Sequence, residues 1–201
     1  MPKSTEERRQ EIADALLRTM SREGYTKSSI AKIAAEAELT PGLIHYHFKT
    51  KQEILRDLIG RLVQRQTGAL STILHGATTP RERLKRLLDA LLQRGETADS
   101  EMASAWVVIT AEAIRQPEIR EDFQEALDAL LGIFVEVIGD GVAQGVFELQ
   151  DGATADAGAA ALVALVHGYL SLGVTVAERI PRGTAAPSAW AMACGLLGIR
   201  E

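Results

Sequence analysis

The stretch from residue 29 to residue 51 constrains the fold of this chain most strongly, because it carries two helix start signals in close succession. In the first helix, apolar residues recur at i, i+3, i+4 and i+7 and form one face: Ile30, Ile33, Ala34 and Ala37. A serine, Ser28 or Ser29, stands before that face, where its hydroxyl can accept a hydrogen bond from an unpaired backbone N–H. Thr40-Pro41 repeats the signal, with threonine as N-cap and proline in the first helical position, where no donor is needed.

The second of these helices is predicted to be very short, from Pro41 to about His47. Lys49-Thr50-Lys51 interrupts it, and Thr50 can cap a new helix. Apolar side chains can hold the short helix against a core, namely Leu43, Ile44 and Phe48. Small and polar residues are left to face outward, namely Gly42, His45, Tyr46 and His47. This pattern is typical of a helix-turn-helix, and the alternative is an ordinary helical hairpin whose polar residues are plain surface.

The motif LTPGLIHYHF at residues 39–48, with Ile33-Ala34 before it and Lys51 and Glu53-Ile54-Leu55 after it, resembles the DNA-binding domain of TetR-family transcriptional regulators. The resemblance covers roughly Thr5 to Leu58. Glu38 stands where the family usually has glycine, so a non-glycine residue must adopt the turn conformation here. His45 stands where the family usually has tyrosine, so an imidazole replaces an expected phenol contact.

This resemblance implies which residues contact DNA. The residues expected at base edges or the adjacent backbone in the major groove are Pro41, Gly42, Leu43, His45 and Tyr46. The residues expected to anchor phosphates are Ser29, Thr40, Tyr46, His47, Thr50 and Lys51. Apolar contact is all that Pro41 and Leu43 can offer, so hydrogen-bonded readout depends largely on His45 and Tyr46 and part of the specificity on DNA shape. One such DNA-binding domain buries little surface on DNA, so two domains about 34–36 Å apart on a palindrome are expected.

Charge is distributed unevenly along the 201 residues. The net charge of −5 argues against nonspecific coating of nucleic acid. Residues 1–51 carry nine Lys or Arg against seven Asp or Glu, and the remainder carries 13 against 20. A weakly basic head on an acidic body suits a protein that recognises a short DNA site. The single cysteine, Cys194, allows no internal disulfide and no cysteine-based metal site, and the N-terminal residues carry no apolar export segment. A cytoplasmic protein is therefore expected.

The remaining sequence is helical in pattern, and we expect an all-α fold of about nine helices, with no internal repeat and no clear strand. The N-terminal three-helix domain is predicted to span residues 1–51, and a helical effector-binding and dimerisation domain residues 52–201. The further helices are expected at about 52–75, 81–96, 99–115, 118–144, 157–177 and 184–199. The run GDGVAQG at 139–145 lacks the GxGxxG spacing of a dinucleotide loop and follows a helix, so Gly145 is interpreted as a helix C-cap.

Two uncharged stretches near the C-terminus, residues 157–177 and 184–199, predict helices that are apolar on all sides. The first is long enough to span a bilayer, but its glycines, histidine, tyrosine and many alanines make it weakly hydrophobic for that role. Helices at about 154–179 and 187–199 are instead predicted to form a homodimer interface without membrane insertion. In the TetR family the last two long helices form a four-helix bundle with their symmetry mates, so the resemblance implies the same.

A pocket for a small-molecule effector of unknown identity is expected in the acidic body. One face of the predicted helix at 99–115 carries Met102, Ala105, Trp106, Ile109 and Glu112. A carboxylate beside an indole could hold a cation, whereas the alternative is that these apolar residues fill the core and Glu112 lies at the solvent edge. Phe134 and His167 are further candidates, with a core or interface role as the alternative for His167. Residues 105–123 loosely resemble the ligand domain of the BetI-like subgroup, which includes choline-responsive repressors.

No catalytic serine, histidine and acid arrangement, metal-ligand spacing or phosphate loop is recognisable, so no enzyme activity, cofactor or metal is predicted. The sequence therefore predicts a repressor that binds a palindromic operator and releases it when a small molecule binds. The alternatives are a helical binding protein or enzyme whose head has lost DNA binding, and a DNA-binding activator or architectural protein without an effector.

Overall fold

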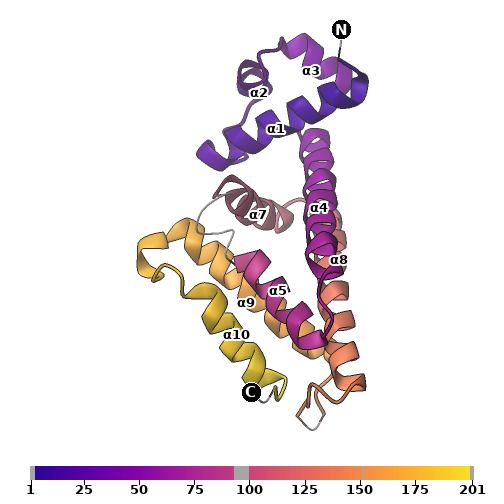
Figure 1. The fold of residues 1–201 in the computed structure, drawn as a ribbon. Coiled ribbons are helices and arrows are strands. Elements are labelled where there is room, and N and C mark those ends of the chain that lie inside the picture. Colours follow the sequence, from indigo (N-terminus) through magenta and orange to yellow (C-terminus); the bar gives the residue numbers. More distant parts are fainter. Residues whose placement is uncertain (1–2, 93–99, 151, 200–201) are drawn as a thin grey trace. The chain divides into compact units, whose positions relative to one another are not determined.

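The computed structural model describes residues 3–92, 100–150 and 152–199, and these residues form helices joined by turns, with no strand among them (Figure 1). The helices are α1 (Thr5–Glu23), α2 (Ile30–Glu36), α3 (Pro41–His47), α4 (Lys51–His75), α5 (Pro80–Leu92), α7 (Ser100–Ala113), α8 (Pro117–Ala143), α9 (Ala155–Thr175), the 3-10 helix η1 (Ala177–Arg179) and α10 (Ala185–Leu196). The all-α prediction is confirmed. Residues 93–99, where one predicted helix ends and the next begins, lie outside the described residues.

The chain divides into two compact units. The first comprises residues 1–64 and 101–126, and the second comprises residues 65–100 and 127–201. Helix α7 and the start of α8 therefore belong to the same unit as α1, α2 and α3. The division at residue 51 into a DNA-binding and an effector-binding domain stays a prediction.

The core of the first unit joins α1 to the two short helices after it. Ile12, Leu16 and Met20 of α1 are fully buried, as the sequence predicts. Helix α1 starts at a reciprocal cap, in which the Ser4 hydroxyl accepts from Glu7 N at 3.2 Å and the Glu7 carboxylate accepts from Ser4 N at 2.6 Å. The same core includes buried residues from α2, α3, the first part of α4, α7 and α8, among them Ile33, Ile44, Leu55, Ile109 and Ile119.

The second unit has its own core. Helix α5 contributes Leu84, Leu87 and Leu88, and α8, α9 and α10 contribute Phe134, Leu162 and Ala189, among others. Helix α8 ends just before Gly145, whose φ of 66° allows the chain to turn as predicted for a C-cap.

Helix α9 has the length and composition of a membrane-crossing helix, although nothing else about it points to a bilayer. Within this chain, 28% of its most apolar 18-residue stretch is buried. Large exposed apolar side chains lie on α9 and α10: Leu172, Met192 and Leu196. Large apolar side chains of both helices are therefore exposed in the part of the chain that the structure describes.

Candidate DNA-binding surface and candidate effector region

Helix α3 begins at Pro41 after the predicted cap Thr40, and α2 begins after one of the two serines that the sequence offers as its cap. The Ser29 hydroxyl accepts a hydrogen bond from Lys32 N at 3.3 Å, and the Thr40 hydroxyl accepts from Leu43 N at 3.3 Å. Ser28, the other candidate cap, is buried, and its hydroxyl donates to Gly24 O at 3.0 Å. The N-cap of α2 is therefore Ser29, and the hydroxyls of Ser29 and Thr40 hold the ends of the two helices in place.

The turn between α2 and α3 is made by Glu38, whose φ of 55° is the single positive value for a non-glycine residue in the described ranges. Leu39 N donates to Ala34 O at 2.8 Å, and Glu38 N donates to Ala35 O at 3.2 Å, so the chain reverses tightly. A Cβ atom in this left-handed conformation is unfavourable, and glycine avoids it. The expectation that a non-glycine adopts the turn conformation is confirmed.

Helix α3 has one buried and one exposed side. Ile44 is fully buried, and Phe48, directly after the helix, is 1% exposed. The exposed residues are Pro41, Gly42, His45 and Tyr46, with Tyr46 75% exposed. Leu43 and His47 are half-buried, so each is shared between the core side and the exposed side. Four of the five predicted base-contacting residues are thus exposed on α3, Leu43 is not fully so, and their contact with DNA stays a prediction.

Lys51 points inward, unlike the other predicted phosphate contacts. Its ammonium donates a hydrogen bond to the backbone carbonyl of Tyr25 at 2.8 Å and lies 4.0 Å from the centre of the Tyr25 ring. Burial lowers the pKa of Lys51, and the carboxylate of Glu112 on α7 opposes that shift. The phosphate role of Lys51 stays a prediction, because its charge already has partners inside the first unit.

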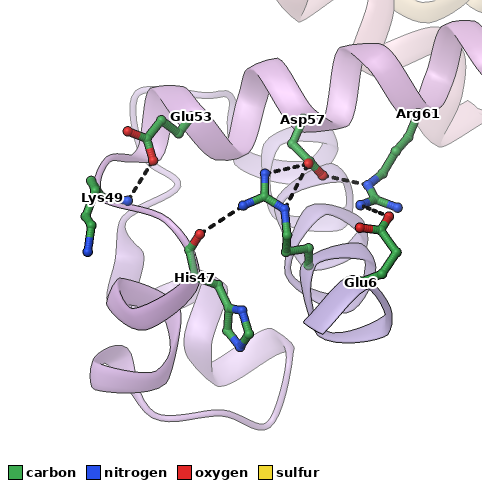
Figure 2. Close-up of polar contacts among 7 residues, drawn as sticks. Glu6, His47, Lys49, Glu53, Asp57 and Arg61 are labelled. Atoms are coloured by element: carbon green, nitrogen blue, oxygen red, sulfur yellow. Dashed lines mark hydrogen bonds and ion pairs between the residues drawn. The ribbon is translucent and has the colours of Figure 1, made fainter. Parts of the chain in front are cut away.

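Lys49 is an exposed cation that the sequence reasoning missed. Its side chain points away from α4 in Figure 2, and its ammonium has no partner among the residues that the structure describes. Its backbone N–H donates to Glu53 at 2.7 Å, and Glu53 N donates to the Thr50 hydroxyl at 3.1 Å, so this turn is fixed at both ends. Two lysines at alternate positions thus have opposite environments, which the local sequence does not reveal.

The predicted effector residues are divided between the two units. On α7, Ala105 and Ile109 are fully buried, and Met102 and Trp106 pack against the core of the first unit. The Trp106 ring lies 6.3 Å from that of Phe123 at an interplanar angle of 53°. Glu112 is half-buried and accepts a hydrogen bond from Gln116 at 2.7 Å.

The other two candidates belong to the second unit. Phe134 is fully buried in its core, and His167 is half-buried on α9, where burial lowers the pKa of its imidazole. The effector role of all seven residues stays a prediction.

A surface groove of about 480 Å³ lies in the second unit, between the end of α4, the start of α5 and the end of α8. Arg83 in its wall binds Glu136 at 2.5 Å and Asp140 at 2.6 Å. The groove contains none of the predicted effector residues: its lining is Thr67, Ser71, Leu74, His75, Ala77, Thr78, Thr79, Pro80, Arg83, Ile133, Glu136, Asp140 and Gln144.

Two regions of the chain match known protein families. Residues 12–58, which contain α2 and α3, match the profile of bacterial regulatory proteins of the tetR family. Residues 80–193, more than half of the chain, match the profile described as BetI-type transcriptional repressor, C-terminal. The chain belongs to the TetR family. The resemblance stated from the motif at residues 39–48 is confirmed, and the chain carries a BetI-type C-terminal region.

Curated TetR-family relatives include the HTH-type transcriptional regulator BetI of Rhizobium meliloti, 32% identical over 117 residues, or 56% of this chain and 55% of that protein. The protein of the same name in Agrobacterium fabrum is 31% identical over 113 residues, or 56% of this chain and 54% of that protein. The matched stretch thus spans little more than half the length of these relatives.

Solved structures match the chain over nearly its full length. A transcriptional regulator from Saccharomonospora viridis, described in complex with choline, is 30% identical with a TM-score of 0.79, over 94% of this chain and 95% of that one. A TetR transcription regulator from Haloarcula marismortui is 23% identical with a TM-score of 0.84, over 96% and 99%. FadR from Bacillus subtilis, in complex with stearoyl-CoA, is 21% identical with a TM-score of 0.77, over 95% and 99%. The last two support the TetR fold alone.

Proposed function

We propose that this TetR-family chain is a homodimeric transcriptional repressor that places α3 in the DNA major groove and is released by a small molecule. The observation that carries the proposal is the two-sided character of α3, with Ile44 buried and Tyr46 75% exposed. A short helix that exposes His45 and Tyr46, on a core shared with α1 and α2, has the geometry of a recognition helix. Because a repressor acts on DNA, we expect this protein to lie in the cytoplasm.

The apolar surface of α9 and α10 supports dimerisation through these helices. Leu172 is 46% exposed and Met192 56% exposed, although both are large hydrophobic residues on helices that carry little charge. A second copy of the chain would cover these side chains by the hydrophobic effect. Two-fold symmetry would then present two copies of α3 to a palindromic site.

The effector is proposed to be a small organic cation. A structure 30% identical over nearly the whole chain is described in complex with choline. In this chain, Trp106 and Phe123 form a half-buried aromatic pair within the region that matches the BetI-type profile. The faces of aromatic rings attract quaternary ammonium groups, so these two rings suit a choline-like ligand.

DNA binding is tested by selecting duplexes from a random pool with the purified chain and measuring affinity by fluorescence anisotropy. The expected result is a two-fold-symmetric motif with half-sites about one helical turn, roughly 34–36 Å, apart. Tyr46→Ala should weaken binding to that motif at least about ten-fold while leaving the melting temperature unchanged, because the side chain is exposed. A chain that selects no motif would support the alternative of a helical binding protein or enzyme that has lost DNA binding.

The effector is tested by adding ligands to the preformed protein–DNA complex. Choline should release DNA, whereas 3,3-dimethyl-1-butanol, which has the same shape without the positive charge, should not. Release by stearoyl-CoA instead of choline would contradict the cationic effector and leave the repressor proposal intact. A reporter gene placed behind the selected motif decides the direction of regulation, because a repressor lowers its expression and an activator raises it.

A further inference from the structure

An arginine on α1 contacts the end of the candidate recognition helix. The Arg9 guanidinium donates through Nη1 to the backbone carbonyl of His47, the last residue of α3, at 3.0 Å. Its Cζ atom also lies 4.0 Å from the centre of the Phe48 ring. The last carbonyls of a helix have no partner within the helix, and a cation at this end interacts favourably with the helix dipole.

An aspartate on α4 holds this arginine in place. Asp57 Oδ1 accepts from Arg9 Nη2 at 2.7 Å and from Nε at 3.3 Å. Asp57 Oδ2 accepts from Arg61 Nε at 2.6 Å, and Arg61 Nη2 donates in turn to Glu6 at 2.7 Å. Figure 2 shows the Arg61 guanidinium between the carboxylates of Asp57 and Glu6, with the His47 carbonyl on the opposite side of the cluster. The four charges balance, and the side chains of Asp57 and Arg61 are 15% and 19% exposed.

Within the described part of the chain, two contacts hold the C-terminal end of α3. The helix has seven residues, and Ile44 is the one it buries fully. Its N-terminal end is capped by Thr40, but its C-terminal end is held by Phe48 and by the hydrogen bond from Arg9. Loss of that hydrogen bond would therefore leave the exposed residues of α3 free to change their angle relative to α1 and α4.

We propose that Arg9 and Asp57 are positioning residues for DNA recognition, which fix the C-terminal end of α3 without contacting DNA. The proposal rests on the proposed function, because it names residues that set the orientation of the recognition helix. The three nitrogen atoms of the Arg9 guanidinium all donate to partners within the first unit, and a nearly buried carboxylate neutralises its charge. Arg9 is therefore engaged inside the protein and is a poor phosphate contact, although it is a cation in the basic head.

The first test compares two charge-removing variants, Arg9→Met and Asp57→Asn, with the wild type on the selected palindrome. Each should weaken specific binding about ten-fold, because the protein loses a charged hydrogen bond that fixes the orientation of α3. Binding to a duplex without the motif should stay within about two-fold of the wild type, because nonspecific binding depends on phosphate contacts. The double variant should bind DNA about as weakly as the single variant with the lower affinity. Both substitutions remove the same contact between Arg9, held by Asp57, and the end of α3.

The salt dependence separates this role from a direct phosphate contact. A positioning residue leaves the slope of log affinity against log salt unchanged, whereas loss of one phosphate contact lowers it by about one for each head. A reduced slope for Arg9→Met, or an equal loss on specific and nonspecific DNA, would overturn the proposal. Arg56→Met is the matched control, because Arg56 forms a similar two-point ion pair with Asp122 at 2.7 and 2.8 Å that does not involve α3.

A second measurement needs no DNA and so separates this proposal from the proposed function. Hydrogen exchange of the Phe48 amide, which bonds to Ile44 O at 2.9 Å, should be about ten-fold faster in Arg9→Met. Exchange of the Ala37 amide, which bonds to Ile33 O in α2 at 3.0 Å, should stay unchanged. If exchange became equally faster at both amides, or faster at neither, Arg9 would not be fixing the end of α3. A wild type that selects no DNA motif would contradict the proposed function. The exchange rates would still decide whether Arg9 fixes the end of α3.

Discussion

The ammonium of Lys51 lies 4.0 Å from the centre of the Tyr25 ring and donates a 2.8 Å hydrogen bond to the carbonyl of the same residue, 26 positions earlier in the chain. Tyr25 is 7% exposed and covers the core of the first unit. Lys51 thus joins the start of α4 to the loop between α1 and α2. Its first role is structural, which changes how a substitution at this position has to be interpreted.

Lys51→Met should lower the free energy of unfolding by about 1–2 kcal/mol, because a charged hydrogen bond and a cation–π contact are lost. Lys49→Met is the matched comparison and should leave stability unchanged, because the Lys49 side chain is exposed. On DNA, Lys49→Met should reduce the slope of log affinity against log salt by about one for each DNA-binding domain, as for the loss of one phosphate contact. Urea unfolding and anisotropy titrations at several salt concentrations measure both effects. Equal stability of the two variants would contradict the structural role of Lys51.

Tyr25 should make the fold sensitive to alkaline pH. Burial, with a smaller contribution from the Glu112 carboxylate, raises the pKa of Tyr25 from 10.0 to about 12. The folded state then keeps a proton that the unfolded state releases, so stability falls as pH rises from 10 to 12. The loss should be roughly 2–3 kcal/mol at pH 12. The difference in unfolding free energy between the wild type and Tyr25→Phe should shift by this amount over that interval, and a constant difference would contradict the assignment.

Glu38→Gly should stabilise the protein by about 0.5–1 kcal/mol, because Glu38 has a φ of 55° and glycine carries no Cβ to clash there. The greater freedom of glycine in the unfolded chain keeps the gain small. Glu38→Ala retains the Cβ and should bring no such gain. Thermal unfolding of the three proteins checks the order, and an alanine variant as stable as the glycine variant would show that the backbone conformation is not the cause.

Two glycines of α8 should respond to alanine in opposite directions. A Cβ on Gly141 would lie 2.1 Å from Cδ2 of Phe147, whereas a Cβ on Gly139 would meet no atom within 4 Å. Gly141→Ala should therefore cost about 1–3 kcal/mol through displacement of the Phe147 ring. Gly139→Ala should stabilise by up to about 1 kcal/mol, since alanine favours a helix. Denaturant midpoints of the two variants measure these changes in stability. A loss of stability in both would mean that helix packing is tight at Gly139 as well.

Charge placed on α9 or α10 should separate the proposed dimer. Leu172→Glu and Met192→Glu each put a carboxylate into the apolar surface of these helices, where a buried and unpaired charge is strongly unfavourable. Sedimentation equilibrium should report a monomer for both at concentrations where the wild type is a dimer. Ile114→Glu is the control, because Ile114 is a large hydrophobic residue 73% exposed on neither helix. A dimer that survives both substitutions would place the interface elsewhere.

Local signals in the sequence predict most of the starts and turns of the short helices. Ser29 and Thr40 cap N–H groups three residues ahead, Glu38 makes its turn within a few residues, and Ile44 and Phe48 follow helical spacing into the core. The motif at residues 39–48 also predicted the TetR family, since its residues are contiguous. Local sequence does not distinguish Ser28 from Ser29 as the cap of α2, because the burial of Ser28 depends on tertiary packing.

The environment of each charged side chain, by contrast, depends on tertiary packing. Lys49 and Lys51 stand two positions apart, yet one is exposed and the other meets Tyr25 across 26 residues of chain. Arg9 meets Asp57 across 48 residues and the end of α3 across 38. Such pairs form because the packing of α1, α3 and α4 brings distant residues within hydrogen-bond distance, and a long side chain binds whichever partner that packing offers.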